Sequence, residues 1–316
     1  MSPGAPLSAL AILVVAGCAG IAWQSPLERE HPLAGRVWDV AAARFIEPRT
    51  LERALADRRY VLLGEKHDNA DHHALQARLL RALVSAGRRP AVAFEMLTTD
   101  RAAAIAAQLA ADPKNADGLA EVVDWKRSGW PDWSLYRPLA QATLDAGLPV
   151  LAGNIPTATA RAVARGDASA LDPTLTATYA LDRPPPQNVL VAMTAELREA
   201  HCGHLPERFV DGMVTAQRAR DAQMAAAMLG AGPDGGVLIA GAGHVRSDRG
   251  VPAYLRARQP EASVASVAFL EVRAEWTTPG DYAATWGGAL PFDYVWFTPR
   301  VDDRDPCESF RARRPA

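Results

Sequence analysis

Short runs of consecutive apolar residues recur along the chain, and most of them lead into a turn. They lie at residues 60–63, 91–94, 149–152, 188–193, 237–240 and 263–272. Near-continuous apolar runs of this length are typical of parallel strands that are buried on both faces of a sheet. We therefore predict six such strands.

The segments between these runs have the spacing of helices. In residues 71–86, leucines recur at intervals of three and four, which places them on one face of a helix. We predict two further helices at residues 135–146 and 209–229. Strands that alternate with helices predict an α/β fold, a three-layer, doubly wound and mostly parallel sheet.

Two stretches, residues 98–133 and 156–206, are too long to be simple connections between neighbouring elements. We expect them to form helical insertions, or a small subdomain, over the C-terminal edge of the strands. The first contains Trp125, Trp130 and Trp133. These side chains are expected either to pack under a loop or to form an apolar lid over a flat ligand.

The composition narrows the range of partners. Apolar residues make up 49% of the chain and charged residues 22%, a balance typical of a soluble globular protein. The formal net charge is −2 and no long basic run occurs. Nucleic-acid binding requires concentrated positive charge, so we expect no nucleic-acid partner.

The first residues have the pattern of a processing signal. Residues 7–17 are an apolar stretch, too short to span a bilayer, which needs about 20 residues, and of the length found in signal peptides. The stretch ends in Val15-Ala16-Gly17-Cys18, which resembles a bacterial lipobox. We predict a lipid anchor at Cys18 and a periplasmic location, with Ala19 favouring the outer membrane; an uncleaved membrane anchor is the alternative.

This processing would leave two cysteines, Cys202 and Cys307. In an oxidising periplasm an even pair can form a disulfide, and two separate thiols are the alternative. The predicted organisation is a signal peptide (1–17), a linker (18–34), an α/β domain (35–300) and a C-terminal tail (301–316).

Polar residues follow several of the predicted strands. Gly64, Glu65 and His67 follow the first strand, Glu95 the second, Asn154 the third, and Gly241 and His244 the fifth. The carboxyl ends of parallel strands meet at one edge of the sheet, where ligands bind in α/β proteins. We therefore predict a functional site at this edge.

Two imidazoles and a carboxylate at one place suit two kinds of chemistry. His67, Glu95 and His244 are candidate ligands for a divalent metal. Alternatively, His67 is a general base that a carboxylate orients. With Glu65 they form the candidate catalytic set, which Gly64, Asn154, Asp221 and Gly241 are expected to support.

The supporting role of Asp221 is predicted from helical spacing. Gln217, Asp221, Met224 and Met228 share one face of the predicted helix at 209–229. That face is expected to be buried and to become polar near the site. A solvent-exposed pair with the neighbouring Arg220 is the alternative.

Two other histidine clusters stand outside this set. His72 and His73 begin the predicted helix at 71–86. We expect one of them to face solvent, while His73 lies close enough in sequence to reach the same edge as His67. The segment at residues 201–204 contains a Cys-x-His pair, but no second pair of ligands completes a structural zinc site.

Eight short segments, taken in order, resemble a known family. They lie at residues 63–69, 94–96, 129–136, 152–154, 201–204, 217–225, 240–252 and 293–297. The chain resembles the ChaN family of haem-binding uptake lipoproteins, in the Tiki-like superfamily. The resemblance implies haem binding and a role in iron acquisition, and kinship with erythromycin esterases and Tiki metalloproteases.

Two functions are compatible with this resemblance. In the first, a tyrosine or histidine is the axial ligand of a bound haem, and the candidates are Tyr136, Tyr179, Tyr294 and His204. In the second, His67, Glu95 and His244 hold a divalent metal while Glu65 accepts a proton from the attacking water. Haem and a membrane lipid anchor are the expected partners, and a homodimer is possible.

Overall fold

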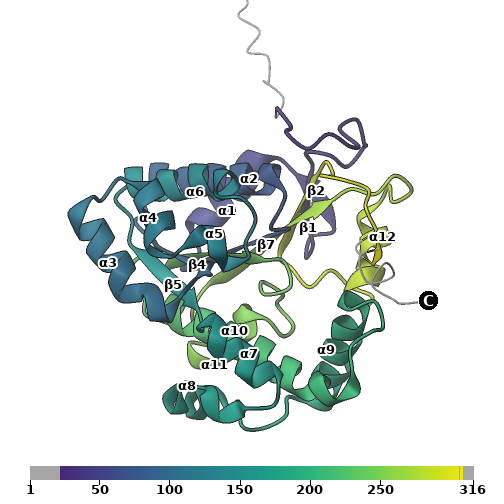
Figure 1. Cartoon of the computed structure of the whole chain (residues 1–316). Coiled ribbons are helices and arrows are strands. Elements are labelled where there is room, and N and C mark those ends of the chain that lie inside the picture. The colour runs from purple at the N-terminus through teal and green to yellow at the C-terminus, as the bar shows by residue number, and fades with distance from the viewer. Residues whose placement is uncertain (1–21, 306, 309–316) are drawn as a thin grey trace, which may run out of the picture.

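The computed structural model describes residues 22–305, 307 and 308 (Figure 1). An eight-stranded sheet lies at its centre, in the order β2-β1-β8-β7-β3-β6-β4-β5. The six strands from β8 to β5 are parallel, and β1 and β2 add an antiparallel edge. The strands are β1 Val37–Asp39, β2 Arg44–Ile46, β3 Tyr60–Glu65, β4 Ala91–Thr98, β5 Val150–Asn154, β6 Gly236–Gly241, β7 Val264–Glu271 and β8 Tyr294–Thr298.

Helices cover both faces of this sheet, as Figure 1 shows. The helices are α1 Pro48–Ala56, α2 Ala70–Ser85, α3 Ala102–Ala111, α4 Ala116–Val122, α5 Trp125–Ser128, α6 Trp133–Asp145, α7 Thr157–Ala164, α8 Pro173–Tyr179, α9 Gln187–Ala200, α10 Val210–Leu229, α11 Val251–Arg258 and α12 Pro279–Ala283. The predicted three-layer α/β fold is therefore confirmed.

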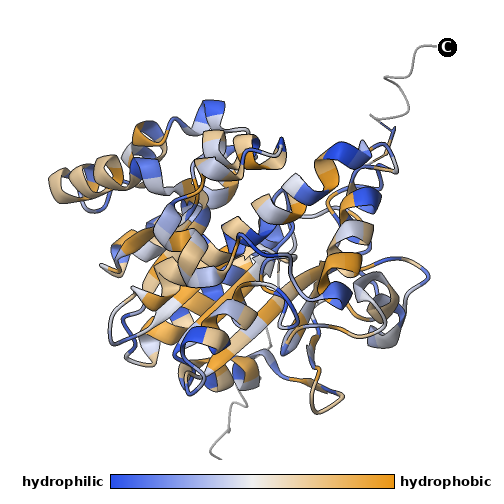
Figure 2. Ribbon diagram, turned by 90° about the horizontal axis from the view of Figure 1, so that it is seen from below, coloured by the Kyte–Doolittle hydropathy of each residue, from blue (hydrophilic) through white to orange (hydrophobic). Residues whose placement is uncertain are grey.

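The two layers of the core follow from the alternation of side chains along each strand. In β3, Val61 and Leu63 pack with α1, α2 and α6, whereas Tyr60 and Leu62 pack with α10 and α11. All four are fully buried, which explains why the strand is apolar at consecutive positions. In Figure 2 the central strands are coloured mainly as hydrophobic.

The apolar run at residues 188–193 was predicted as a strand, and that prediction is wrong. It lies in helix α9, where Met193 and Leu197 pack against Val214 of α10. A short apolar run does not by itself distinguish a strand from one turn of a buried helix face. The four-residue interval between Met193 and Leu197 is the pattern that favours the helix.

The segments at both ends of the domain are packed against it. In the part of the expected linker that the structure describes, the amides of Gln24 and Ser25 donate to Asp71, and Leu33 is buried. Near the C-terminus, Cys307 forms a disulfide with Cys202, with their Cα atoms 5.6 Å apart. The disulfide joins the last described residues to the loop after α9.

The predicted lipid attachment site, Cys18, and the signal peptide lie outside the described residues. Within the described part of the chain, no helix combines the length and the apolar character that crossing a membrane requires.

Candidate functional site

The ends of three neighbouring strands bring the candidate residues together. Strand β6 lies between β3 and β4, and Glu65 at the end of β3 is aligned with Gly241 at the end of β6. His67 follows β3, Glu95 lies within β4, and His244 follows β6. The predicted juxtaposition of His67, Glu95 and His244 is therefore present.

Carboxylates and imidazoles alternate in an unbroken row across this edge. His67 Nδ1 lies 2.9 Å from Glu65 Oε1, and His67 Nε2 lies 4.0 Å from Glu95 Oε2. Glu95 Oε1 lies 3.3 Å from His244 Nε2, and His244 Nδ1 lies 2.7 Å from Asp221 Oδ1. The row has three acids and two imidazoles, and Asp221 of α10 is its last member.

Glu65 is the buried anchor of the row. Tyr136 of α6 donates a 2.7 Å hydrogen bond to Glu65 Oε1, and His73 Nδ1 of α2 lies 3.1 Å from Glu65 Oε2. Burial would raise the pKa of Glu65, but His73 and His67 outweigh it and lower the pKa well below its usual value. Glu65 is thus an anion that holds His67 in place.

His73 must be protonated in this arrangement. Its Nε2 donates to the carbonyl oxygen of His67 at 3.0 Å, while its Nδ1 faces the oxygens of Glu65 and Gln76. An imidazole that meets only acceptors at both nitrogens donates from both and carries a charge. The pKa of His73 is raised accordingly, because Glu65 outweighs the effect of burial.

Glu95 is held from its other side by backbone. The amide of Gly241 donates to Glu95 Oε2 at 2.8 Å, and the side-chain amide of Asn154 donates to the Glu95 carbonyl at 3.0 Å. Burial opposes ionisation, but His244 and His67 lower the pKa of Glu95 to about 2. A Cβ on Gly241 would lie 3.1 Å from His67 Nε2, so glycine lets this ring lie close to the strand end.

His244 lies between two carboxylates. Its side chain is 12% exposed, and its nitrogens face Glu95 and Asp221. Burial alone would lower the pKa of His244, but the two acids raise it to about 10. Burial also raises the pKa of Asp221, against the opposing effect of His244. The alternative that Asp221 forms only a solvent-exposed pair with Arg220 is wrong, because Asp221 is 6% exposed.

The residues of this row are zinc-type donors, but they are arranged as ion pairs. The Nε2 atoms of His67 and His244 lie near Glu95. Their Nδ1 atoms are held by Glu65 and Asp221, respectively, as a carboxylate holds many metal-binding histidines. However, no group of three or more His, Cys, Asp or Glu side chains in the described part of the chain is placed to hold a metal ion. The structure therefore gives no support to the predicted metal site.

His67 is the most accessible member of the row. Its side chain is 34% exposed, and the ring of Trp130 lies edge-on to it at a centroid distance of 4.8 Å. Trp125 is 5% exposed and packs edge-on against Trp133 and at a tilt against Tyr136. Trp125 is therefore a packing residue, whereas Trp130 borders the exposed edge of His67.

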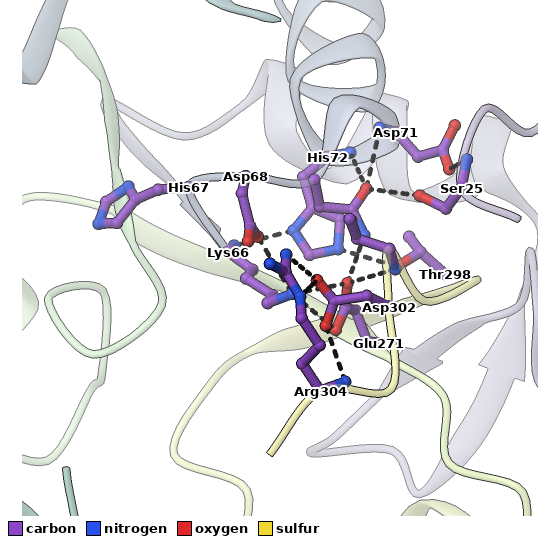
Figure 3. Close-up of polar contacts among 12 residues, drawn as sticks. Ser25, Lys66, His67, Asp68, Asp71, His72, Glu271, Thr298, Asp302 and Arg304 are labelled. Atoms are coloured by element: carbon purple, nitrogen blue, oxygen red, sulfur yellow. Dashed lines mark hydrogen bonds and ion pairs between the residues drawn. The ribbon is translucent and has the colours of Figure 1, made fainter. Parts of the chain in front are cut away.

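The expectation that His72 or His73 faces solvent is wrong, because both are buried. His72 Nδ1 accepts a hydrogen bond from the Lys66 amide at 2.9 Å, and its Nε2 donates to Thr298 at 2.8 Å. Burial lowers the pKa of His72 well below its usual value. Figure 3 shows His72 within this network and His67 pointing away from it.

The four candidate haem ligands lie apart from one another. Tyr136 is 1% exposed and its hydroxyl is bonded to Glu65. Tyr179 ends α8 and packs against Tyr254, with ring centroids 5.7 Å apart. Tyr294 begins β8, and His204 lies in the exposed loop after α9.

None of these four lines the large cavity beside the row, which has a volume of about 1230 Å³. Its walls come from the end of β7, the loop that follows, α12 and the last described residues of the chain. The lining includes Glu65, Lys66, Phe269, Arg273, Trp276, Tyr282, Trp286, Arg300 and Arg304. This cavity was not predicted from the sequence, because most of its walls come from residues 269–308, outside the motif that contains Glu65 and Lys66.

The fold and the row define an α/β protein with a polar site at the carboxyl ends of its parallel strands. Residues 51–255 match the family described as "Haem-binding uptake, Tiki superfamily, ChaN". This match covers more than half of the chain, which therefore belongs to that family, as the resemblance implied.

The chain is similar to several solved structures, the first of which supports the fold. A structure described as cofacial heme binding to ChaN of Campylobacter jejuni has a TM-score of 0.64 at 19% identity, over 82% of this chain and 95% of that chain. The type III effector HopBA1 gives 0.45 at 14% identity, over 79% and 92%. An erythromycin esterase EreC mutant gives 0.43 at 15% identity, over 84% and 82%. No curated protein matches the chain.

Proposed function

We propose that this protein binds haem and assists haem or iron uptake at the bacterial envelope. Family membership over residues 51–255 is the observation that carries the proposal. The cavity beside the row adds support, since its volume of about 1230 Å³ exceeds the roughly 300–1,000 Å³ usual for small-molecule sites. A large, flat ligand needs such a volume.

Part of the cavity lining suits the groups of a haem. Trp276 and Trp286 are partly exposed and offer flat apolar faces to a macrocycle. Arg273 and Arg304 are the candidate partners for propionates, although Arg304 pairs with Asp302 and acidic side chains outnumber basic ones in the described lining. Tyr282 is the one tyrosine among the described residues that line the cavity, and a tyrosine phenolate is a known axial ligand of haem iron.

In this structure Tyr282 has hydrogen-bond partners within the chain. Its hydroxyl accepts from the Arg273 amide at 2.9 Å and donates to the Trp276 carbonyl at 3.3 Å. Burial raises the pKa of Tyr282. Because Tyr282 is only 3% exposed, binding through its oxygen would require the segment around Trp276 to move, and it would break the long bond to the Trp276 carbonyl and leave the bond from Arg273.

A hemin titration of the purified protein tests this proposal. We expect a shifted Soret band, a changed band position in Tyr282→Phe, and weaker binding in Trp286→Ala. Tyr294→Phe is the matched control, because Tyr294 does not line the cavity. An absent Soret shift, or identical spectra and affinities in the wild type, Tyr282→Phe and Trp286→Ala, would contradict haem binding in this cavity.

The proposed location is the periplasmic face of the outer membrane, with Cys18 as the lipidated residue. The disulfide between Cys202 and Cys307 supports a place outside the cytoplasm. Fractionation of cells that express the wild type or Cys18→Ser tests the lipid anchor. We expect the wild type in the membrane fraction and the variant outside it. The homodimer remains a prediction, and analytical ultracentrifugation with and without hemin measures it.

A second candidate function is hydrolysis, which one feature of the row favours. His67 combines a partly exposed ring with a buried carboxylate on its Nδ1, the pairing that orients a general base. Burial opposes protonation of His67, but Glu65 and Glu95 raise its pKa. This pairing supports a base mechanism in which His67 takes the proton of water, without a metal.

Hydrolysis of a chromogenic p-nitrophenyl ester tests this candidate. We expect His67→Gln to abolish turnover and the exposed-loop variant His204→Gln to retain it. Metal analysis of protein that was never exposed to a chelator separates the two mechanisms. Stoichiometric metal in the wild type that is lost in a His67→Ala/His244→Ala double variant would favour the metal-dependent mechanism. Equal rates in the wild type and His67→Gln would end the hydrolase hypothesis.

A further inference from the structure

A second, smaller cavity lies beside His244. Its volume is about 130 Å³, and its lining includes Met193, Glu196, Leu197, Asp221, His244 and Arg249. Met193 and Leu197 come from α9 and are each 8% exposed. An engineered apolar cavity of about 150 Å³ binds benzene, so this volume admits a short alkyl group.

Arg249 is the unusual residue of this lining. Its side chain is only 8% exposed, and its Nη1 is buried without a hydrogen-bond partner. A buried donor that lacks a partner costs roughly 1–3 kcal/mol, and more when it is charged. A buried donor of this kind calls for a partner, which can be a water, an ion or a ligand.

The loop that carries Arg249 is tightly folded. The Gly250 amide donates to the Arg246 carbonyl at 3.0 Å, and the Val251 amide donates to the His244 carbonyl at 2.8 Å. A Cβ on Gly250 would collide with the His244 carbonyl oxygen. The position of Arg249 relative to His244 is therefore set by backbone contacts.

One carboxylate already pairs with Arg249. Glu196 of α9 contacts Arg249 Nη2, and the Glu196 side chain is 48% exposed. Water can solvate the half-exposed Glu196 when it turns away, but the buried guanidinium then needs another anion. A ligand carboxylate that takes the place of Glu196 keeps the guanidinium paired.

We propose that this cavity is a binding site for a small carboxylate that carries a short apolar chain. The ligand carboxylate replaces Glu196 on Arg249 and takes both Nη atoms, in the bidentate geometry that arginine favours. The apolar chain packs against Met193 and Leu197. The ligand then lies directly beside His244, and the site does not depend on haem binding.

Two sources carry this chemistry, a free short-chain acid and the propionate arm of a haem. Butyrate is the probe for the site, and butyramide, which has the same shape without the charge, is the matched control ligand. Hemin and hemin dimethyl ester distinguish the sources. Displacement of butyrate by hemin but not by the ester identifies the propionate, whereas no displacement by either identifies a free acid.

Isothermal titration calorimetry on the purified protein tests the proposal with two opposite variants. Arg249→Gln should weaken butyrate binding about tenfold or more, the size expected for loss of a charged hydrogen-bonded pair. Glu196→Gln removes the internal competitor and should strengthen binding about two- to fivefold. Arg198→Gln is the matched control, because Arg198 is an ion-paired arginine of α9 outside the cavity.

The strengthening by Glu196→Gln separates ligand binding from a purely structural role, since a damaged fold does not raise affinity. Unfolding temperatures of all variants verify that the protein is intact. The proposal is overturned if butyrate binds no better than butyramide, or if Arg249→Gln and Glu196→Gln bind butyrate as the wild type does.

Discussion

Replacing the buried anchor of the row, Glu65→Gln, removes one negative charge and keeps the shape of the side chain. The Glu65 side chain is 0% exposed and lies 3.1 Å from the 1% exposed His73. Breaking a buried ion pair from one side typically costs about 3–5 kcal/mol, because the remaining charge is left uncompensated. His67 adds less, since a third of its side chain is in water.

We expect the free energy of unfolding to fall by about 3 kcal/mol, because His73 can lose its proton and so avoid the full penalty. This is a large share of the roughly 5–15 kcal/mol that stabilises a typical protein. Urea unfolding at neutral pH measures the loss, and an NMR titration measures the pKa of His73, which should fall in the variant.

Tyr136→Phe is the matched control for this experiment. It removes the 2.7 Å hydrogen bond to Glu65 but keeps the charge, so the pKa of His73 should stay raised. If Glu65→Gln lost less than about 1 kcal/mol and left the pKa of His73 unchanged, the account of Glu65 as the anchoring anion would be refuted.

Three further predictions concern stability. A Cβ on Gly64 would collide with Val245 and lie 2.9 Å from the Ala242 Cα. Gly64→Ala should therefore lower the free energy of unfolding in urea by about 1–3 kcal/mol. Gly230→Ala is the control and should lower it less, because the nearest atom that its Cβ would meet is 3.5 Å away. The double variant Cys202→Ser/Cys307→Ser removes a cross-link between residues 105 positions apart. Loop entropy limits the expected loss of unfolding free energy to about 4.7 kcal/mol. An unfolding temperature equal to that of the wild type would contradict a native disulfide. The pKa of His244 is raised to about 10, so its contribution is complete below the unfolded value of 6.5 and is lost as the pH rises through 10. The fall in unfolding free energy between pH 7 and 10 should therefore be shallower in His244→Gln, and equal slopes would show that His244 is not protonated.

Much of the site was predictable from local sequence. Five apolar runs became strands, and the residues that follow three of them meet at one edge, because parallel strands present their carboxyl ends together. The position of Asp221 followed from helical spacing. His73 was detectable from its place six residues after His67, at the first turn of α2.

Other features depended on contacts between distant residues. Tyr136 reaches Glu65 across 71 positions and Arg249 reaches Glu196 across 53, and no local pattern encodes such pairs. Helix α9 was mistaken for a strand, because only its packing against α10 shows which of its faces is buried.

The sequence by itself therefore determined five of the eight described strands, the layers and the polar ends of three strands, since backbone geometry converts local periodicity directly into a buried face. Only the tertiary structure decided which charges pair, which cysteines bond, and where the two cavities lie. These depend on how separate elements pack, and packing brings together residues whose neighbours in sequence carry no trace of the contact.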